Sequence, residues 1–274
     1  MHSILIDSEE VQIPSSFNGY IVKKKIGEGS FGSVFKVMKK ETKEIFAAKF
    51  CYMKEGEQTL SETFIKNEAK ILSIVNHPNI VKLYEAFEIE NEQNQKLFVI
   101  IEEFCSRGSL FDFVNDGFLK NRRKNENKRM IRGFLEAVSY LHKMNVSHCD
   151  IKCENILADE NYNTKLCDFG FSINFDCPYA KKRRGSPLYL APEFFFSKDF
   201  DFFKAEVWSV GVVIFAFSQG RLPYEDIMIH LERKLEIKMK NKKLKKIVKQ
   251  CLTYDAHKRP TIEYLLNANY LKIT

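Results

Sequence analysis

Residues 148–155 and Asp168 combine acidic, basic and amide side chains at close spacing. The stretch reads His-Cys-Asp-Ile-Lys-Cys-Glu-Asn, and Asp168 opens an Asp-Phe-Gly sequence eighteen residues after Asp150. The side-chain oxygens of Asn155 and Asp168 are hard ligands that suit Mg²⁺. The carboxylate of Asp150 could accept the proton of a hydroxyl group, and Lys152 could place a positive charge beside a phosphate. The spacing therefore indicates a site for magnesium and phosphate.

A glycine-rich segment near the start of the chain could also contact phosphate. Residues 27–34 read Gly-Glu-Gly-Ser-Phe-Gly-Ser-Val, with β-type residues on both sides. Glycines let backbone amides approach phosphate oxygens without a Cβ in the way. Because no helix pattern follows directly, the segment predicts a strand–loop–strand hairpin rather than a dinucleotide-binding turn. No Gly-Lys-Ser/Thr occurs, so a P-loop is excluded as well.

A strand and a helix follow the glycine-rich segment. Residues 44–52 are strand-like and include Lys49. Residues 59–75 place apolar side chains three and four positions apart, which predicts a helix with Ser61 as its N-cap. Glu68 lies on this predicted helix.

The pattern of elements changes near residue 106. The strand candidates before it are 20–26, 34–38, 44–52, 81–88 and 96–101, and the helix candidates after it are 108–115 and 129–143. Residues 1–19 show no clear period and are interpreted as a lead-in. We therefore predict an α+β chain whose first part is rich in strands and whose second part is mostly helical.

The composition is that of a soluble globular protein. The chain has 274 residues, of which 45% are hydrophobic and 29% are charged. No run of about 18 apolar residues occurs and the first residues lack a secretory pattern, so we expect no transmembrane helix and no signal. The seven cysteines form no Cys-x-x-Cys pair and are expected to be free thiols in a reducing compartment, the cytoplasm or the nucleus.

The net charge of +7 is concentrated in three basic clusters. They lie at 120–129, 181–184 and 233–249. Such clusters can attract acidic proteins, phosphates or nucleic acid, but most are solvated surfaces, which is the interpretation we favour for the first and third. The run at 181–184 could meet an acidic substrate or partner. No nucleic-acid motif with interleaved aromatic residues accompanies the clusters, so no nucleic-acid partner is expected.

These motifs, in this order, resemble those of the eukaryotic protein kinases of the serine/threonine type. Residues 27–34 resemble the glycine-rich loop of that family, residues 46–49 its Val-Ala-Ile-Lys strand and residues 148–155 its catalytic loop. The resemblance covers residues 20–271. Lys-Cys-Glu-Asn and Gly-Ser-Pro-Leu-Tyr-Leu-Ala-Pro-Glu are most similar to the calmodulin-kinase-like branch.

The resemblance implies a bilobal protein kinase fold. Residues 20–105 would form an N-lobe, with an antiparallel sheet and one main helix, and residues 106–274 a mostly helical C-lobe. The protein would be an ATP-dependent serine/threonine kinase that phosphorylates Ser and Thr hydroxyls of protein substrates. No membrane partner is expected, and no regulatory partner is indicated.

The resemblance also assigns roles to individual residues. Asp150 and Lys152 would be catalytic, while Asn155 and Asp168 would hold Mg²⁺. The residues expected to bind ATP in the cleft are Ile26, Gly27, Gly29, Gly32, Val34, Ala47, Lys49, Glu68, Glu103, Cys105 and Leu157. The resemblance further implies three sets of contacts. Lys49 would pair with Glu68, Ser186 would contact both Asp150 and Lys152, and Arg259 would pair with Glu193.

Four departures from the family pattern bear on activity. Cys149 replaces the Arg that normally binds an activation-segment phosphate, and residues 180–185 contain no Ser, Thr or Tyr. We infer that phosphorylation of this segment does not switch the enzyme; loss of most activity after phosphatase treatment, with the phosphate mapped to 172–186, would contradict this. Glu206 replaces the usual helix Asp. Glu102 stands at the usually apolar gatekeeper position, so either the register is one residue off or the adenine pocket is polar at its back.

A catalytically impaired kinase fold that acts as a scaffold is the alternative function. Cys149 and Glu206 favour it slightly. Four residues argue against it, because a scaffold needs none of them together. They are Lys49, Asp150, Asn155 and Asp168.

Overall fold

The computed structural model describes residues 2–6, 9–29, 32–54, 59–116, 124–176, 185–226, 228, 231–232 and 235–271. Part of the glycine-rich segment (30–31), parts of the first and third basic clusters (120–123 and 233–234) and the whole run 181–184 lie outside these residues. The chain divides into two compact units. Unit 1 comprises Met1–Asn76 and Val81–Cys105, and unit 2 comprises His77–Ile80 and Ser106–Thr274.

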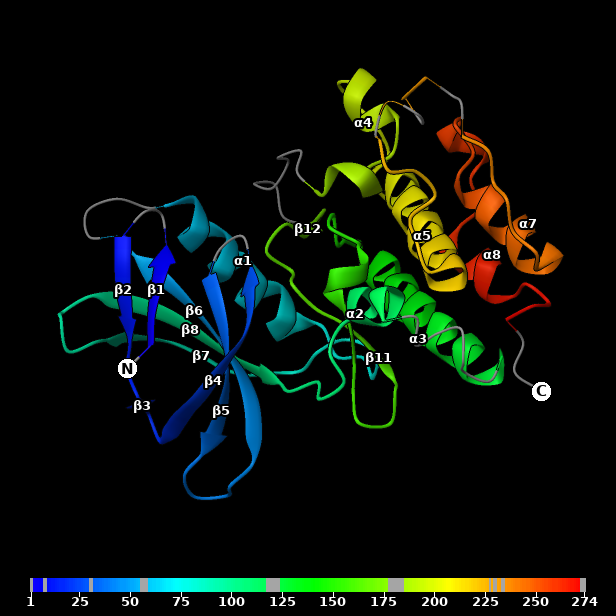
Figure 1. The fold of residues 1–274 in the computed structure, drawn as a ribbon. Coiled ribbons are helices and arrows are strands. Elements are labelled where there is room, and N and C mark those ends of the chain that lie inside the picture. Colours follow the sequence, from blue (N-terminus) through cyan, green and yellow to red (C-terminus); the bar gives the residue numbers. More distant parts are fainter. Residues whose placement is uncertain are drawn as a thin grey trace. The chain divides into compact units, whose positions relative to one another are not determined.

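Unit 1 is built on a six-stranded antiparallel sheet (Figure 1). Its strands are β3 (Ser16–Phe17), β4 (Tyr20–Gly29), β5 (Gly32–Lys39), β6 (Ile45–Met53), β7 (Leu83–Glu90) and β8 (Lys96–Glu103), in the order β3-β4-β5-β6-β8-β7. The central strand β6 is buried along nearly its whole length, whereas every second residue of the edge strand β7 is exposed. The predicted glycine hairpin is confirmed as β4 and β5, which pair directly.

The lead-in contributes structure of its own to unit 1. Strand β1 (His2–Ile6) pairs with β2 (Glu9–Ile13) in a small separate sheet. Val11 and Ile13 of β2 are fully buried in the same core as Phe17 and Phe50. Phe50 meets Phe17 edge-on, with ring centroids 5.2 Å apart, a favourable geometry for aromatic rings. Residues before 20 therefore stabilise the strand-rich unit.

Helix α1 (Leu60–Ile74) brings Glu68 into unit 1. Its N-cap is Thr59 rather than the expected Ser61, because the side chain of Thr59 accepts the backbone N–H three residues further on. Ser61 is instead buried within the first turn. Phe64 and Leu72 are buried on the same side of the helix as Glu68.

Unit 2 is mostly helical, as predicted. Its helices are α2 (Leu110–Asn115), α3 (Lys124–Lys143), α4 (Glu193–Phe196), α5 (Phe202–Gln219), α7 (Lys242–Cys251) and α8 (Ile262–Leu266). Two short antiparallel strand pairs lie in the segments between these helices. They are β10 (Ile156–Ala158) with β11 (Thr164–Leu166), and β9 (Val146–Ser147) with β12 (Ile173–Asn174).

Helix α5 forms the centre of unit 2. By length and composition it is the one described helix that could cross a membrane, but 67% of its apolar window is buried inside the structure, as in the core helix of a globular unit. Helix α7 packs on it, and Figure 1 shows the two side by side in yellow and orange. Gly211 permits this close packing, because a Cβ there would lie 2.5 Å from the Cβ of Cys251.

Candidate active site

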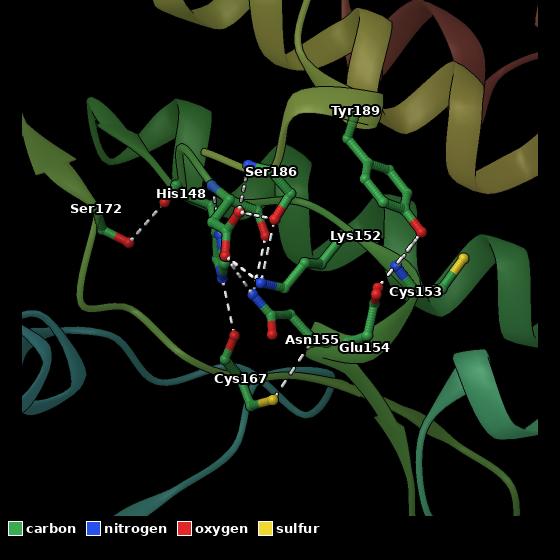
Figure 2. A network of polar contacts seen from close by, with 10 residues as sticks. His148, Lys152, Cys153, Glu154, Asn155, Cys167, Ser172, Ser186 and Tyr189 are labelled. Carbon is green, nitrogen blue, oxygen red and sulfur yellow. Dashed lines mark hydrogen bonds and ion pairs between the residues drawn. The ribbon is translucent and has the colours of Figure 1, made fainter. Parts of the chain in front are cut away.

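The loop between β9 and β10 carries Asp150, Lys152 and Asn155. Figure 2 shows Lys152 and Asn155 within this polar network. The Nζ of Lys152 lies 2.8 Å from Oδ2 of Asp150. The side-chain amide of Asn155 donates to the Asp150 carbonyl at 2.9 Å and to its Oδ2 at 3.1 Å. Asp150 and Asn155 are both buried. The loop therefore holds a carboxylate in one orientation with a cation beside it.

Ser186 closes this network from the other side. Its hydroxyl donates to Oδ1 of Asp150 at 2.9 Å, and its backbone N–H donates to the same oxygen at 3.1 Å. Lys152 donates to the Ser186 hydroxyl oxygen at 3.2 Å. The expected bridge between Asp150 and Lys152 is therefore confirmed.

Gly185 makes that bridge possible, a role that the sequence analysis did not assign to it. Its φ of 144° lies in the region that side chains rarely adopt, and a Cβ there would lie 2.9 Å from the Cys149 carbonyl and 2.7 Å from Leu190. Only glycine lets the segment before Ser186 run so close to the loop of Asp150.

The charge state of Lys152 follows from two opposing effects. Burial is the largest single effect and disfavours the ammonium, but the charge and hydrogen bond of Asp150, together with nearby carboxylates, raise the pKa of Lys152 above its usual value. Asp168 and Glu154 act in the same direction. Lys152 therefore carries a full positive charge at neutral pH.

Glu206 of α5 contacts the loop, as the usual Asp at this position would. It accepts the backbone N–H of Cys149 at 2.8 Å and the hydroxyl of Ser147 at 3.1 Å, and it lies 2.7 Å from Nε2 of His142. Burial alone would raise the pKa of this carboxyl, but the contact with His142, the charges of His142 and His148 and the Cys149 N–H together lower it. The extra methylene of Glu thus does not prevent contact with the loop.

The chain directly before Asp168 is hydrogen-bonded to the backbone of Asn155. The backbone N–H of Cys167, directly before Asp168, donates to the Asn155 carbonyl at 3.0 Å. Asp168 has a φ of 65°, a strained conformation for a residue other than glycine. The next residue, Phe169, is fully buried and meets the His148 ring edge-on at 4.7 Å. The backbone of the turn after β11 is therefore tied to the loop that carries Asn155.

The side-chain oxygens of Asn155 and Asp168 in unit 2 are suitable ligands for a hard cation. The Asn155 amide nitrogen is used by Asp150, and its carbonyl Oδ1 remains for a metal. Among the described residues, no group of three or more His, Cys, Asp or Glu could hold a metal alone. Mg²⁺ is commonly bound by one or two protein oxygens together with phosphates and water, so Asn155 and Asp168 suit it better than a zinc-type ion.

Lys49 and Glu68 form a buried ion pair in unit 1. Nζ of Lys49 lies 2.6 Å from Oε2 of Glu68, and the two side chains are 6% and 1% exposed. The predicted pairing is confirmed. In a buried setting the pair fixes the position of the lysine, since separating the charges would leave one unpaired.

The glycine hairpin runs next to Lys49. Val34 of β5 pairs with Gly27 on one side and Lys49 on the other. Gly32 has a steric reason to be glycine, because a Cβ there would lie 2.0 Å from the Phe50 carbonyl oxygen. At Gly27 a Cβ would meet only Val34, at an ordinary 3.7 Å.

The remaining expected ATP residues fall in both units. Ile26 and Gly29 lie on β4, and Ala47 on β6 pairs with Glu102 on β8. The N–H of Glu103 donates to the Lys82 carbonyl at 2.9 Å, and Cys105 is buried two residues later. Leu157 belongs to unit 2, on β10. Glu102 is buried at the end of β8.

Arg259 anchors the segment that follows Ser186. Its guanidinium contacts both carboxylate oxygens of Glu193, at 2.6 and 2.8 Å, and donates to the backbone carbonyls of Thr253, Lys204 and Tyr254. The Arg259 side chain is fully buried. The expected pair is therefore confirmed as a bidentate contact.

The comparisons with known proteins agree with this arrangement. The family model described as "Protein kinase domain" matches residues 20–271. The chain is 31% identical to mouse NUAK family SNF1-like kinase 1 over 75% of the chain and 30% of that protein. It is 33% identical to SNF1-like protein kinase ssp2 of Schizosaccharomyces pombe over 77% of the chain and 35% of that protein. It is also 30% identical to the serine/threonine-protein kinase pakF of Dictyostelium discoideum over 93% of the chain and 22% of that protein.

The chain belongs to the eukaryotic protein kinase family, serine/threonine type. The SNF1-like names are consistent with the calmodulin-kinase-like branch. The chain spans about a third or less of the length of these three curated relatives.

Proposed function

We propose that this protein transfers the γ-phosphoryl group of ATP to serine and threonine hydroxyls of proteins. The observation that carries the proposal is the network around Asp150, where Lys152, Ser186 and Asn155 all contact one buried carboxylate. A scaffold would have no use for this arrangement, and Glu206, which slightly favoured that alternative in the sequence, still contacts the catalytic loop.

Asp150 would accept the proton of the substrate hydroxyl as that oxygen attacks phosphorus. Its two oxygens are held by Ser186 and Asn155, so the carboxylate needs little reorientation before the reaction. Lys152, whose pKa is raised by Asp150, would stay charged and stabilise the negative charge of the transferring group.

The ATP phosphates would be bound by residues of unit 1. Lys49, fixed by Glu68, would contact the α- and β-phosphates, and the backbone amides around Gly27 and Gly29 would contact phosphate oxygens. A Cβ at Gly27 would not clash with the described protein atoms around it. The close approach of a phosphate would explain why glycine occurs at this position, which supports the proposed role.

The adenine ring would contact apolar residues and two backbone positions. The apolar residues are Ile26, Val34, Ala47 and Leu157, and the backbone positions are Glu103 and Cys105. Cys105 lies two residues beyond the end of β8, outside the strand pairing of the sheet. Asn155 and Asp168 would hold Mg²⁺, which when bound supplies positive charge that neutralises the phosphates.

Phosphate transfer from labelled Mg·ATP to a mixed Ser/Thr/Tyr peptide library tests this function. We expect labelled phosphoserine and phosphothreonine but no phosphotyrosine, and no label with Asp150→Asn. The exposed Asp199 offers a matched control, because Asp199→Asn makes the same chemical change away from the network. Absence of transfer together with ATP binding in a thermal-shift assay would favour the scaffold instead.

We also propose a reducing compartment, the cytoplasm or the nucleus, as the place of action. Six described cysteines are free thiols, which supports this location. Protein substrates carrying Ser or Thr are the expected partners.

A further inference from the structure

Helix α7 carries a basic face that the proposed catalytic residues do not use. Its lysines are Lys242, Lys243, Lys245, Lys246 and Lys249, and no acidic residue occurs between Glu236 and Asp255. Lys242, Lys245, Lys246 and Lys249 line one open hollow together with Gln250 and Thr253. Positions three, four and seven apart lie on one side of a helix, so the four lysines form a continuous stripe.

The opposite side of α7 fixes the orientation of this stripe. Leu244, Ile247, Val248 and Cys251 are buried in unit 2. Cys251 lies so close to α5 that residue 211 there must be glycine. Helix α7 therefore cannot rotate to bury its lysines, and the stripe remains at the surface.

The stripe is electrostatically unfavourable in the free protein. Lys242 and Lys243 lie in the first turn, where the backbone N–H groups already carry partial positive charge, and that turn contains no acidic residue. Lysines three and four positions apart repel one another. Within the described residues, none of the four stripe lysines takes part in an ion pair, whereas nearby Lys238 contacts Glu236 at 3.0 Å. An acidic partner would relieve this repulsion.

We propose that the α7 basic face (Lys242, Lys245, Lys246 and Lys249) binds an acidic segment of another protein, with carboxylates at alternate positions. From Lys242 to Lys249 the stripe is about 10 Å long at ~1.5 Å per helical residue. Alternate side chains of an extended peptide lie ~6.6 Å apart, so two or three carboxylates match the stripe. Gln250 and Thr253 add uncharged polar groups at its end.

The composition of the face favours a protein over a membrane or a nucleic acid. Helices that bind membrane surfaces insert large apolar side chains, but the apolar side of α7 is buried, and among the described residues from 238 to 253 no large apolar side chain is exposed. The face also presents no aromatic ring on which a base could stack.

Fluorescence anisotropy with a labelled eight-residue peptide of alternating Glu and Gly tests the proposal. The purified chain is titrated at low and at physiological salt, with a Gln-Gly peptide of the same length as the neutral probe. The test variant carries Lys242→Gln, Lys245→Gln, Lys246→Gln and Lys249→Gln. The matched control carries four lysine-to-glutamine changes at Lys23, Lys24, Lys40 and Lys43, which are exposed in unit 1.

We expect the Glu-Gly peptide to bind, more weakly as salt rises, and the test variant to lose roughly tenfold or more in affinity. The control variant should stay within about twofold of the parent protein, and circular dichroism should show both variants folded. Equal binding by parent and test variant, or equal losses in both variants, would overturn the proposal. So would stripe-dependent binding to phosphatidylserine vesicles or to duplex DNA without binding to the peptide.

Discussion

The Glu206 carboxylate accepts the backbone N–H of Cys149 at 2.8 Å, and Cys149 has a φ of 65°. This left-handed conformation is unfavourable for a residue with a side chain, by roughly 1–3 kcal/mol. The hydrogen bond from α5 holds the strained residue directly before Asp150. Helix and catalytic loop are thus coupled through one carboxylate.

Removal of this carboxylate should destabilise the protein strongly. Glu206→Ala leaves the Cys149 N–H, the Ser147 hydroxyl and His142 without their shared acceptor, and we expect a loss on the order of 3–5 kcal/mol in urea unfolding. Glu206→Asp should lose less, because it can still reach the N–H. The exposed Glu160 gives the control, since Glu160→Ala should change stability by less than about 0.5 kcal/mol. Similar losses for Ala at both sites would contradict the coupling.

The lowered pKa of Glu206 predicts that the stability of the protein depends on pH. Because the folded protein lowers the pKa of Glu206 below 4.5, its charge contributes stability that is complete above about pH 4.5 and is lost as the pH falls through the lower folded value. The difference in unfolding free energy between the parent protein and Glu206→Gln should therefore be present from pH 7 down to about pH 4.5 and shrink below pH 4.5. Urea titrations from pH 7 to pH 3.5 measure it, and a difference that grows in acid would reverse the assigned sign.

Arg259 and its neighbour Lys258 allow a buried ion pair to be compared with an exposed one. Arg259→Ala leaves Glu193 partly buried and uncompensated, so we expect a loss on the order of 3–5 kcal/mol. Lys258→Ala breaks only the exposed contact with Asp255 and should cost at most about 1 kcal/mol. Arg259→Lys should recover only part of the stability, because lysine keeps the positive charge but cannot form the bidentate contact. Equal losses at 258 and 259 would show that burial does not govern the strength of these pairs.

The two ends of the glycine hairpin should respond differently to alanine. Gly32→Ala places a Cβ against the Phe50 carbonyl and should lower the melting temperature, together with ATP affinity. Gly27→Ala meets no such obstacle, so its melting temperature should change little while ATP affinity falls. Thermal unfolding and ATP titration of both variants measure stability and affinity separately. A large fall in the melting temperature of Gly27→Ala would contradict this prediction.

The order of strands and helices could be predicted from the sequence because the apolar periods and the glycine hairpin are local signals. The resemblance to the protein kinase family also implied the partners Lys49 and Glu68, which lie on neighbouring elements. The N-cap of α1 could not be placed, because Thr59 and Ser61 are equally suitable residue types two positions apart.

Other features depend on contacts between distant segments. Gly185 is required by the Cys149 carbonyl, 36 residues earlier, and no local pattern marks that approach. The lead-in lacks a clear period, yet Val11 and Ile13 are buried because the sheet of unit 1 provides a core for them. Ser147 becomes a partner of Glu206 only through the packing of β9 near α5.

The measurement that tests the central claim most directly is single-turnover phosphate transfer by Asp150→Asn, with ATP binding measured on the same sample. If Asp150 accepts the substrate proton, the rate of transfer should fall by roughly 10²–10⁴ while the Kd for ATP stays within about twofold of the parent value. Asp199→Asn should leave both unchanged. A transfer rate for Asp150→Asn close to that of the parent protein would contradict the role of Asp150, and with it the account of the network formed by Lys152, Asn155 and Ser186.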